Sequence, residues 1–267
     1  MDNGLTLPRI RALMLDIDGV LLEDGEPIPG AAESVRALLG LGLEIRFVTN
    51  TTAMTRRRLL ERLERLGFPV TGDRLFTVAA LARRLFDRAG KSRYRLLGPP
   101  ELVEDLGQGH VALDDPSSPD WVVMGLHIPA FQHETLNIGL RDLLNGATLV
   151  ALHANRVWRT RRGMEVGLGA YVRALEYAAR TEAVVMGKPS RAFFEEVLHD
   201  LALPPDQVAM VGDDSESDVG GAQAAGIHGI QVRTGKFSPR SLALAGVTPD
   251  LTVDDINDLA RRFLSER

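Results

Sequence analysis

The chain has 267 residues, of which 45% are hydrophobic and 25% are charged, enough apolar content for one large domain or two small ones. A net charge of -5 and the lack of a long basic tract argue against nucleic acid as the main partner, because nucleic-acid-binding domains carry a strongly positive face. The chain has no cysteine, which excludes disulfides, thiolate metal ligands and a cysteine nucleophile. With no signal-peptide pattern and no apolar run near the roughly 18 residues of a membrane span, we expect a cytoplasmic protein without a membrane partner.

The first predicted strand is a short apolar run at 13–15 that ends in Asp16 and Asp18, followed by Gly19. Side chains alternate along a strand, so both carboxylates would point the same way unless the chain bends at Gly19. Two crowded carboxylates repel each other and favour a cation between them. A hard metal ion is one interpretation; the other is that one aspartate caps a turn and the other is solvated.

The next elements predict a parallel sheet. A helix over 31–39 leads to a strand over 43–48, which ends in Thr49 and Asn50, and helices follow over 54–66 and 78–88. A β-α-β unit of this kind favours parallel strands joined by a right-handed crossover.

The middle third has a shorter rhythm and predicts a second α/β unit inserted into the first. Strands are expected at 94–97, 111–113, 121–126 and 148–152, with helices at 101–106 and 131–144. The predicted division is a core domain (1–77), an inserted cap (78–180) and the rest of the core (181–267).

The least regular stretch is 156–169, which is basic and spaced by glycines. Such a loop could receive an anionic substrate, although an exposed connection is an equal alternative. The candidate substrate residues in it are Trp158, Arg159, Arg161 and Arg162.

After a helix over 171–179, strands predicted at 183–186 and 208–211 also end in polar residues. In open α/β sheets, ligands bind beyond the carboxyl ends of the strands, so the polar residues at the four strand ends should converge on one crevice. They are Asp16, Asp18, Thr49, Asn50, Lys188, Asp213 and Asp214.

This set of residues fits phosphoryl transfer better than a hydrolase triad. Mg²⁺ prefers oxygen ligands, which Asp16 and Asp213 could supply, while Lys188 offsets charge on the transferring group. Hydroxyl and amide groups at Thr49 and Asn50 could hold its oxygens. A carboxylate can itself attack phosphorus to form an aspartyl-phosphate, with a second carboxyl group moving the protons.

Four short motifs carry a resemblance to the haloacid dehalogenase superfamily of phosphatases. They are D-I-D-G-V at 16–20, T-N at 49–50, G-K-P at 187–189 and G-D-D-x-x-x-D at 212–218. The long insert resembles the large α/β cap of the subfamily that includes NagD, pyridoxal phosphate phosphatase and 4-nitrophenylphosphatase. The stretches 47–52, 174–178 and 218–226 look closest to the phospholysine phosphohistidine inorganic pyrophosphate phosphatase branch.

The resemblance implies a Rossmann-like parallel sheet core with an inserted α/β cap domain. It implies a Mg²⁺-dependent phosphatase that hydrolyses a small phosphate monoester, a pyrophosphate or a phosphoramidate through an aspartyl-phosphate. Dimers formed through the cap are common in the resembled subfamily, so a homodimer is one expectation, while the sequence itself leaves the oligomeric state open.

Carried over by position, the resemblance implies roles for five aspartates. Asp16 would be the nucleophile, and Asp18 the acid/base that also lends its backbone carbonyl to Mg²⁺. Asp213 would be the other carboxylate ligand, with Asp214 and Asp218 at or just beyond the ligands. Some members of the closest branch have serine in place of Asp18. The aspartate restores the common superfamily pattern and supports phosphatase activity, but it argues against carrying over that branch's substrate preference.

The phosphate group would be held by Thr49, Asn50 and Lys188. Two other readings use similar residues: a phosphorylation-controlled receiver-like signalling module, and a phosphomutase or dehalogenase on the same scaffold. In this chain the acidic D-D pair is the last of the motifs, whereas in receiver domains it comes first, which argues against a receiver. Dehalogenases usually lack the second aspartate of the first motif, so Asp18 argues against a dehalogenase.

Overall fold

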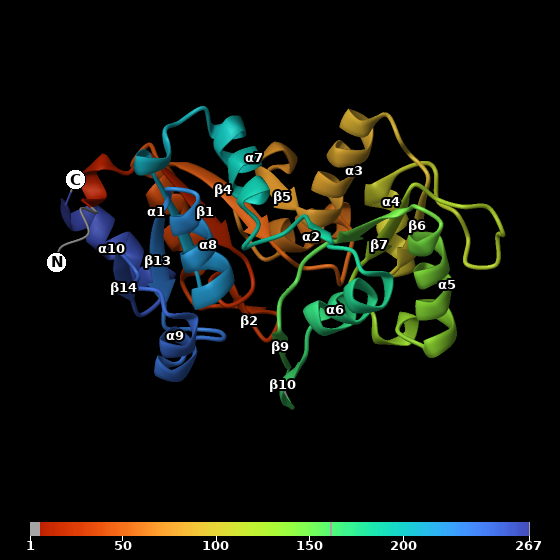
Figure 1. Ribbon diagram of the computed structural model, residues 1–267. Coiled ribbons are helices and arrows are strands. Elements are labelled where there is room, and N and C mark those ends of the chain that lie inside the picture. Colours follow the sequence, from red (N-terminus) through yellow and green to blue (C-terminus); the bar gives the residue numbers. More distant parts are fainter. Residues whose placement is uncertain (1–5, 161, 267) are drawn as a thin grey trace. The chain divides into compact units, whose positions relative to one another are not determined.

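A computed structural model describes residues 6–160 and 162–266 of the chain (Figure 1). Contacts divide the chain into two compact units. The first runs from the N-terminal part to Thr49 and includes Leu60–Phe76 and the chain from Lys188 onward; the second comprises Asn50–Leu59 and Thr77–Gly187. The predicted cap, 78–180, falls within the second unit, which also takes up 50–59 and 181–187.

The first unit contains a six-stranded sheet in the order β14-β13-β12-β1-β4-β5. Strand β1 lies between β12 and β4 and is parallel to both, with Leu13 opposite Ala209 on one side and Ile45 on the other. All five residues of β1 are buried, as expected for a central parallel strand covered on both faces. The strands are β1 (Ala12–Asp16), β4 (Glu44–Thr49), β5 (Leu75–Thr77), β12 (Val208–Gly212), β13 (His228–Val232) and β14 (Leu251–Val253).

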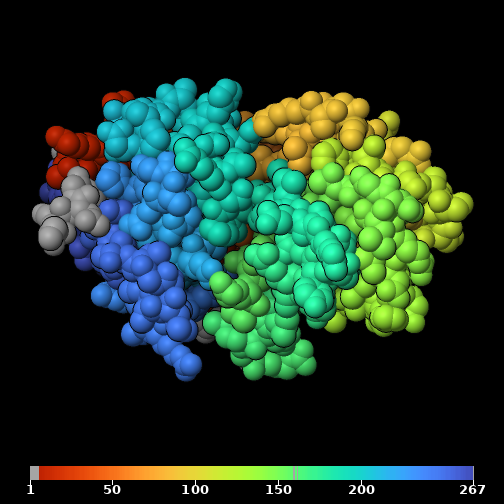
Figure 2. Space-filling view, in the orientation of Figure 1, coloured from red at the N-terminus to blue at the C-terminus, as the bar shows by residue number. Residues whose placement is uncertain are grey.

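The helices of the first unit pack in pairs, α1 with α10 and α7 with α8. Helix α10 places Ile256, Leu259 and Phe263 on one buried face, at the spacing of an amphipathic helix. In Figure 2 the visible surface of this unit comes mostly from residues after 188. The elements are η1 (Leu7–Arg9), the hairpin β2 (Leu22–Glu23) and β3 (Glu26–Pro27), α1 (Ala31–Gly40), α2 (Arg56–Arg65), which crosses the boundary between the units, η2 (Gly72–Arg74), α7 (Arg191–Leu201), η5 (Pro205–Gln207), the π-helical turn η6 (Ser215–Gly220), α8 (Gly221–Ala224), α9 (Pro239–Ala245) and α10 (Ile256–Glu266).

The second unit is built on a four-stranded sheet in the order β11-β8-β7-β6, in which each neighbouring pair is parallel. Its strands are β6 (Tyr94–Leu97), β7 (Trp121–Met124), β8 (Thr148–Ala151) and β11 (Val184–Val185). Its other elements are α3 (Val78–Ala89), η3 (Pro100–Leu102), α4 (Val103–Leu106), η4 (Ile128–Ala130), α5 (His133–Leu144), α6 (Leu168–Ala179) and a separate hairpin of β9 (Val157–Thr160) and β10 (Gly163–Val166).

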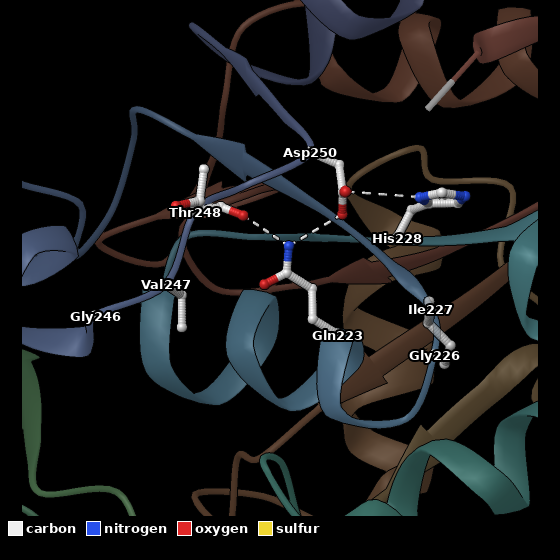
Figure 3. Close-up of a pocket in the computed structure, with 8 residues that line it drawn as sticks. All are labelled: Gln223, Gly226, Ile227, His228, Gly246, Val247, Thr248 and Asp250. Atoms are coloured by element: carbon white, nitrogen blue, oxygen red, sulfur yellow. Dashed lines mark hydrogen bonds and ion pairs between the residues drawn. The ribbon is translucent and has the colours of Figure 1, made fainter. Parts of the chain in front are cut away.

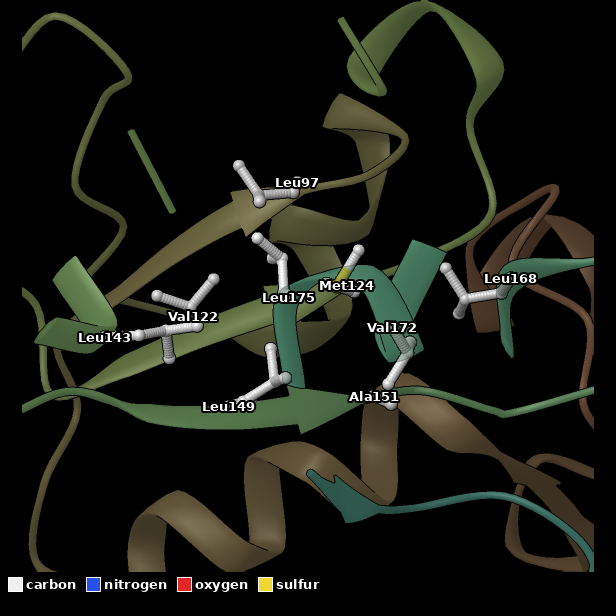
Figure 4. Packing of buried hydrophobic residues seen from close by; sticks show 9 residues of the cluster. All are labelled: Leu97, Val122, Met124, Leu143, Leu149, Ala151, Leu168, Val172 and Leu175. Atoms are coloured by element: carbon white, nitrogen blue, oxygen red, sulfur yellow. The ribbon is translucent and has the colours of Figure 1, made fainter. Parts of the chain in front are cut away.

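The core of the second unit lies between this sheet and two helices. Side chains of β6, β7 and β8 meet Leu168, Val172 and Leu175 of α6 and Leu143 of α5 (Figure 4). Burying an apolar side chain of this size stabilises a fold by about 1.5–3 kcal/mol. The second unit therefore gains stability from a hydrophobic core of its own.

The structure confirms the α/β class with a parallel sheet in each unit and corrects three local predictions. The strand predicted at 183–186 is β11, which pairs with β8 in the second sheet and not with the core strands. No strand covers 111–113; a single bridge joins Tyr94 to His110 instead. The irregular stretch 156–169 contains the antiparallel pair β9 and β10, in which Val157 lies opposite Val166 and Thr160 opposite Gly163. No helix in the described part of the chain is both long and apolar enough to cross a membrane.

Candidate active site

Three aspartates form a buried acidic cluster in the first unit. Asp16 ends β1, Asp213 follows β12 and Asp218 lies in the η6 turn, and each contributes one carboxylate oxygen to a group within 4.8 Å of one another. Their exposed fractions are 8%, 3% and 1%. Burial raises the pKa of all three carboxyl groups, that of Asp213 well above its usual value and that of Asp218 to about 7.

Lys188 brings the neighbouring positive charge. Its Nζ lies 2.8 Å from Asp16 Oδ1 and 2.7 Å from Asp218 Oδ1, and its side chain is 2% exposed. Burial lowers the pKa of the ammonium, but the attraction of Asp16 and Asp218 outweighs burial and raises it. Lys188 and Lys236 supply two positive charges beside the four carboxylates of Asp16, Asp213, Asp214 and Asp218, so the site can accept a further cation.

Asp213 carries the observation that bears most directly on a metal. Its Oδ2 accepts a hydrogen bond of 2.7 Å from the Lys236 backbone N–H, whereas its Oδ1 is buried with no hydrogen-bond partner among the described residues. An unpartnered buried carboxylate oxygen costs about 1–3 kcal/mol or more, which a bound cation would offset. The all-oxygen donor set of the cluster fits a hard divalent cation.

Asp214 faces the η6 turn and not the acidic cluster. Its Oδ1 accepts hydrogen bonds from the backbone N–H groups of Glu216, at 3.2 Å, and Ser217, at 3.0 Å, so it caps this turn. Its Oδ2 lies 3.1 Å from Lys236 Nζ. Burial raises the pKa of Asp214, but Lys236 and the donors from Ser217 outweigh burial and lower it. Asp214 therefore supports the turn that carries Asp218.

Asp18 lies beyond the end of β1, so the strand alternation expected for Asp16 and Asp18 does not apply to it. The chain turns after Ile17, with the Gly19 N–H bonded to the Leu22 carbonyl at 2.6 Å. The Asp18 residue is exposed to solvent while Asp16 is buried. Although the Asp18 residue is exposed, protein atoms near its carboxyl group reduce the access of water to it, which raises its pKa against the lowering effects of Lys236, Arg62 and Lys188. The two aspartates thus occupy different environments.

The T-N pair is divided between the two units. Thr49 is the last residue of β4 and is 1% exposed, and β4 pairs with β1 so that Val48 lies opposite Asp16. Asn50 belongs to the second unit, where its Nδ2 donates to Asn155 Oδ1 at 2.9 Å. The phosphate-binding roles of both residues stay predictions.

The candidate substrate loop is the β9–β10 hairpin. Trp158 lies in β9 and is 37% exposed. The side chain of Arg162 is 87% exposed and lies 3.3 Å from Glu165. Arg161 and the side chain of Arg159 lie outside the described residues. The role of this loop stays a prediction.

Sequence patterns missed two polar residues that shape the site, Lys236 and Gln231. Gln231 is fully buried in β13; its Nε2 lies within 3.1 Å of the Gly212, Asp213 and Val232 carbonyls, and its Oε1 accepts from Ser215 at 2.7 Å. A glutamine between Ile230 and Val232 was the signal in the sequence. It fixes the start of the loop that carries Asp213.

A separate pocket of about 490 Å³ lies elsewhere in the first unit (Figure 3). Its polar side chains are bonded to one another: Gln223 Nε2 donates to the Thr248 carbonyl at 2.7 Å and to Asp250 at 3.1 Å, and His228 lies 3.8 Å from Asp250. No member of the acidic cluster lines it. These interactions connect α8, β13 and the segment before β14, so the side chains have a structural role here.

Comparisons with known proteins identify the family to which the chain belongs. A haloacid dehalogenase-like hydrolase model matches residues 13–111, and a second HAD-hydrolase-like model matches 185–259. The chain is 39% identical over 245 residues to haloacid dehalogenase-like hydrolase domain-containing protein 2 of Homo sapiens, covering 92% of each chain. It is 37% identical over 267 residues to phospholysine phosphohistidine inorganic pyrophosphate phosphatase of Danio rerio, covering 98% of this chain and 97% of the relative.

A solved structure, the p-nitrophenyl phosphatase from Archaeoglobus fulgidus, matches with a TM-score of 0.86 and 29% identity, covering 95% of this chain and 99% of that one. The chain therefore belongs to the haloacid dehalogenase-like hydrolases and, within them, to the phosphatases of the NagD group, near the phospholysine phosphohistidine inorganic pyrophosphate phosphatase branch.

Proposed function

We propose that this protein is a Mg²⁺-dependent phosphatase that hydrolyses a small phosphate monoester through an aspartyl-phosphate on Asp16. The observation that carries the proposal is the buried acidic cluster, in which Asp213 Oδ1 has no partner among the described residues and Asp16 is paired with Lys188. Several carboxylates buried this close together favour a bound cation, and Asp16 is the last residue of the central strand β1 and lies 2.8 Å from Lys188 Nζ.

Asp16 and Asp213 would hold Mg²⁺, with Asp218 beside them. The ion, when bound, offsets negative charge on the transferring phosphoryl group. Lys188 adds a second positive charge and, by holding Asp16 Oδ1, restricts the rotation of that carboxyl group. Thr49, at the adjacent strand end, would donate its hydroxyl to a phosphate oxygen.

In the first step a carboxylate oxygen of Asp16 attacks phosphorus, and the bond from phosphorus to the ester oxygen breaks as the new bond forms. Asp18, whose pKa is raised, donates a proton to the leaving oxygen. In the second step Asp18 takes a proton from water as the water oxygen attacks phosphorus. The bond between phosphorus and Asp16 breaks, which releases inorganic phosphate and restores both aspartates.

We propose a small phosphorylated molecule as the substrate. Two relatives are named for phosphatase activity, one on p-nitrophenyl phosphate and one on phospholysine, phosphohistidine and inorganic pyrophosphate. A screen across aryl phosphates, nucleotides, sugar phosphates, pyridoxal phosphate, pyrophosphate and phosphoamino acids will define the preferred class.

The test is hydrolysis of p-nitrophenyl phosphate by metal-stripped protein during a Mg²⁺ titration. Activity should be absent without Mg²⁺, return with the ion and fall at least about a hundredfold in Asp213→Asn at fixed Mg²⁺. Asp254→Asn is the matched control, because that side chain is 74% exposed and pairs with the exposed side chain of Arg233. Turnover that survives EDTA, or equal activity in both variants, would rule out the proposed metal site.

A further inference from the structure

Residues Thr234, Gly235 and Lys236 follow the end of β13 after one intervening residue and contact the loop after β1 and the loop after β12. The Thr234 hydroxyl donates to the Gly19 carbonyl, the residue after Asp18. The Lys236 backbone N–H donates to Asp213, and its Nζ lies 3.1 Å from Asp214 Oδ2. We propose that this segment, here called the 234–236 clamp, positions the carboxylates for metal binding; the inference rests on the proposed Mg²⁺ site.

The first part of the argument is the space at Gly235. A Cβ atom on Gly235 would lie 2.1 Å from Asp213 Oδ2, and one on Gly19 would lie 2.2 Å from the same oxygen. Distances this short are incompatible with a side chain. Both residues also have positive φ, +63° for Gly235 and +88° for Gly19, which glycine adopts without strain. The Asp213 carboxylate is therefore held between two glycine backbones.

The second part is which oxygen of Asp213 remains available. The Lys236 N–H occupies Oδ2 at 2.7 Å, and Oδ1 has no hydrogen-bond partner within the described part of the chain. A carboxylate fixed at one oxygen and confined on both sides presents its other oxygen in a single direction. The clamp thus makes Asp213 a ligand through one oxygen, with a set orientation.

The third part of the argument is that the 234–236 clamp also contacts residues next to the other aspartates. Through its ammonium, Lys236 holds Asp214, which caps the η6 turn that carries Asp218. Through Thr234, the clamp holds the backbone immediately after Asp18. Partners behind metal ligands of this kind change metal affinity by about 10–100-fold when removed. None of the three residues needs to touch the substrate for this effect.

The test measures Mn²⁺ binding to metal-stripped protein by electron paramagnetic resonance, without substrate. Gly235→Ala is compared with Gly246→Ala, a matched control with φ of +65° and no atom within 4 Å of an added Cβ. Both variants carry the same backbone strain, so both should lose some thermal stability. Gly235→Ala should bind Mn²⁺ more than about tenfold more weakly than the wild type, and Gly246→Ala should bind like the wild type.

Equal Mn²⁺ affinity in the two folded glycine variants would overturn the clamp. If circular dichroism shows that Gly235→Ala is unfolded, Thr234→Val decides, since it removes one hydroxyl and keeps the side-chain shape. Thr234→Val should weaken Mn²⁺ binding several-fold, and wild-type affinity there would refute the inference. A wild-type protein that binds no Mn²⁺ would refute the proposed metal site itself and the clamp with it.

Discussion

Lys188 and Asp16 form an ion pair of 2.8 Å that is almost closed to water, with side-chain exposures of 2% and 11%. Removing one partner of such a pair leaves an uncompensated buried charge, which is more costly than losing a surface pair. The pair therefore joins the stability of the first unit to the residue proposed as the nucleophile.

Replacing Lys188 with Met should lower the free energy of unfolding at pH 7 by about 3 kcal/mol, because Asp16 and Asp218 both lose their ammonium partner. Urea denaturation, monitored by circular dichroism, measures this change in the free energy of unfolding. Arg240→Met, an exposed residue of the same unit, should stay within about 0.5 kcal/mol of the wild type. Equal denaturation midpoints for the two variants would show that the buried pair contributes no stability.

The raised pKa of Asp218 predicts how the stability of the metal-free protein changes with pH. Its pKa is raised from 3.8 to about 7, chiefly by burial, so the folded state binds a proton more tightly than the unfolded state does. Its stabilising contribution is fully present below about pH 4 and is lost as the pH rises through about 7. The difference in stability between the wild type and Asp218→Asn should therefore fall between pH 4 and 7.

Thermal melts of both proteins across this pH range measure that difference. Saturating Mg²⁺ should reduce the change of this stability difference with pH, because a nearby cation favours the ionised carboxylate. A difference that stays constant from pH 4 to 7 would contradict the raised pKa of Asp218.

Gln231→Leu should destabilise the protein by about 2 kcal/mol, since it leaves buried acceptors at Gly212 and Asp213 without their donor. It should also weaken Mg²⁺ binding, measured by isothermal titration calorimetry, because Asp213 loses its backbone anchor. Gln223→Leu is the matched control: it loses hydrogen bonds to Thr248 and Asp250, which are not members of the acidic cluster, and should keep its Mg²⁺ affinity. The same affinity in both leucine variants would contradict the anchoring role of Gln231.

The second unit contains its own buried ion pair. Arg95 Nε lies 2.5 Å from Asp142 Oδ2, with side-chain exposures of 3% and 9%. Asp142→Ala should destabilise this unit by about 3 kcal/mol, because the guanidinium stays buried without its carboxylate. The fluorescence of Trp121, 7% exposed in β7, reports unfolding of this unit in urea.

Asp87→Ala provides the comparison, since it breaks an exposed pair with Arg83 in the same unit and should cost less than about 0.5 kcal/mol. A similar shift of the urea midpoint in the two variants would show that the buried pair is no stronger than the surface pair.

Much of the fold could be predicted because its signals are local. Apolar runs at β1, β4 and β12 end in polar residues, and parallel strands in one sheet bring such ends to one edge. The partner of β11 could not be predicted, since a strand of two residues carries no pattern that selects a sheet. The hairpin of β9 and β10 was missed because its arginines and glycines hid the alternation of a strand.

Within the site, the sequence pointed to Asp16, Lys188 and Asp213, which the structure brings to one place. It did not distinguish Asp214 from Asp218; the structure turns Asp214 toward the η6 turn and places Asp218 in the cluster. Lys236 was missed because its role depends on a backbone N–H and on a chain reversal after β13, which no motif spacing encodes.

The most direct test of the central claim is whether phosphate becomes bonded to Asp16. In Asp18→Asn, the group that activates water is lost, so an acyl-phosphate formed from a good leaving group such as p-nitrophenyl phosphate should accumulate. Acid quench followed by mass spectrometry of the peptide that contains Asp16 measures it. The proposed mechanism predicts a phosphorylated Asp16 in Asp18→Asn and none in the Asp16→Asn/Asp18→Asn double variant. A phosphorylated residue elsewhere, or undiminished turnover in Asp16→Asn, would contradict the mechanism.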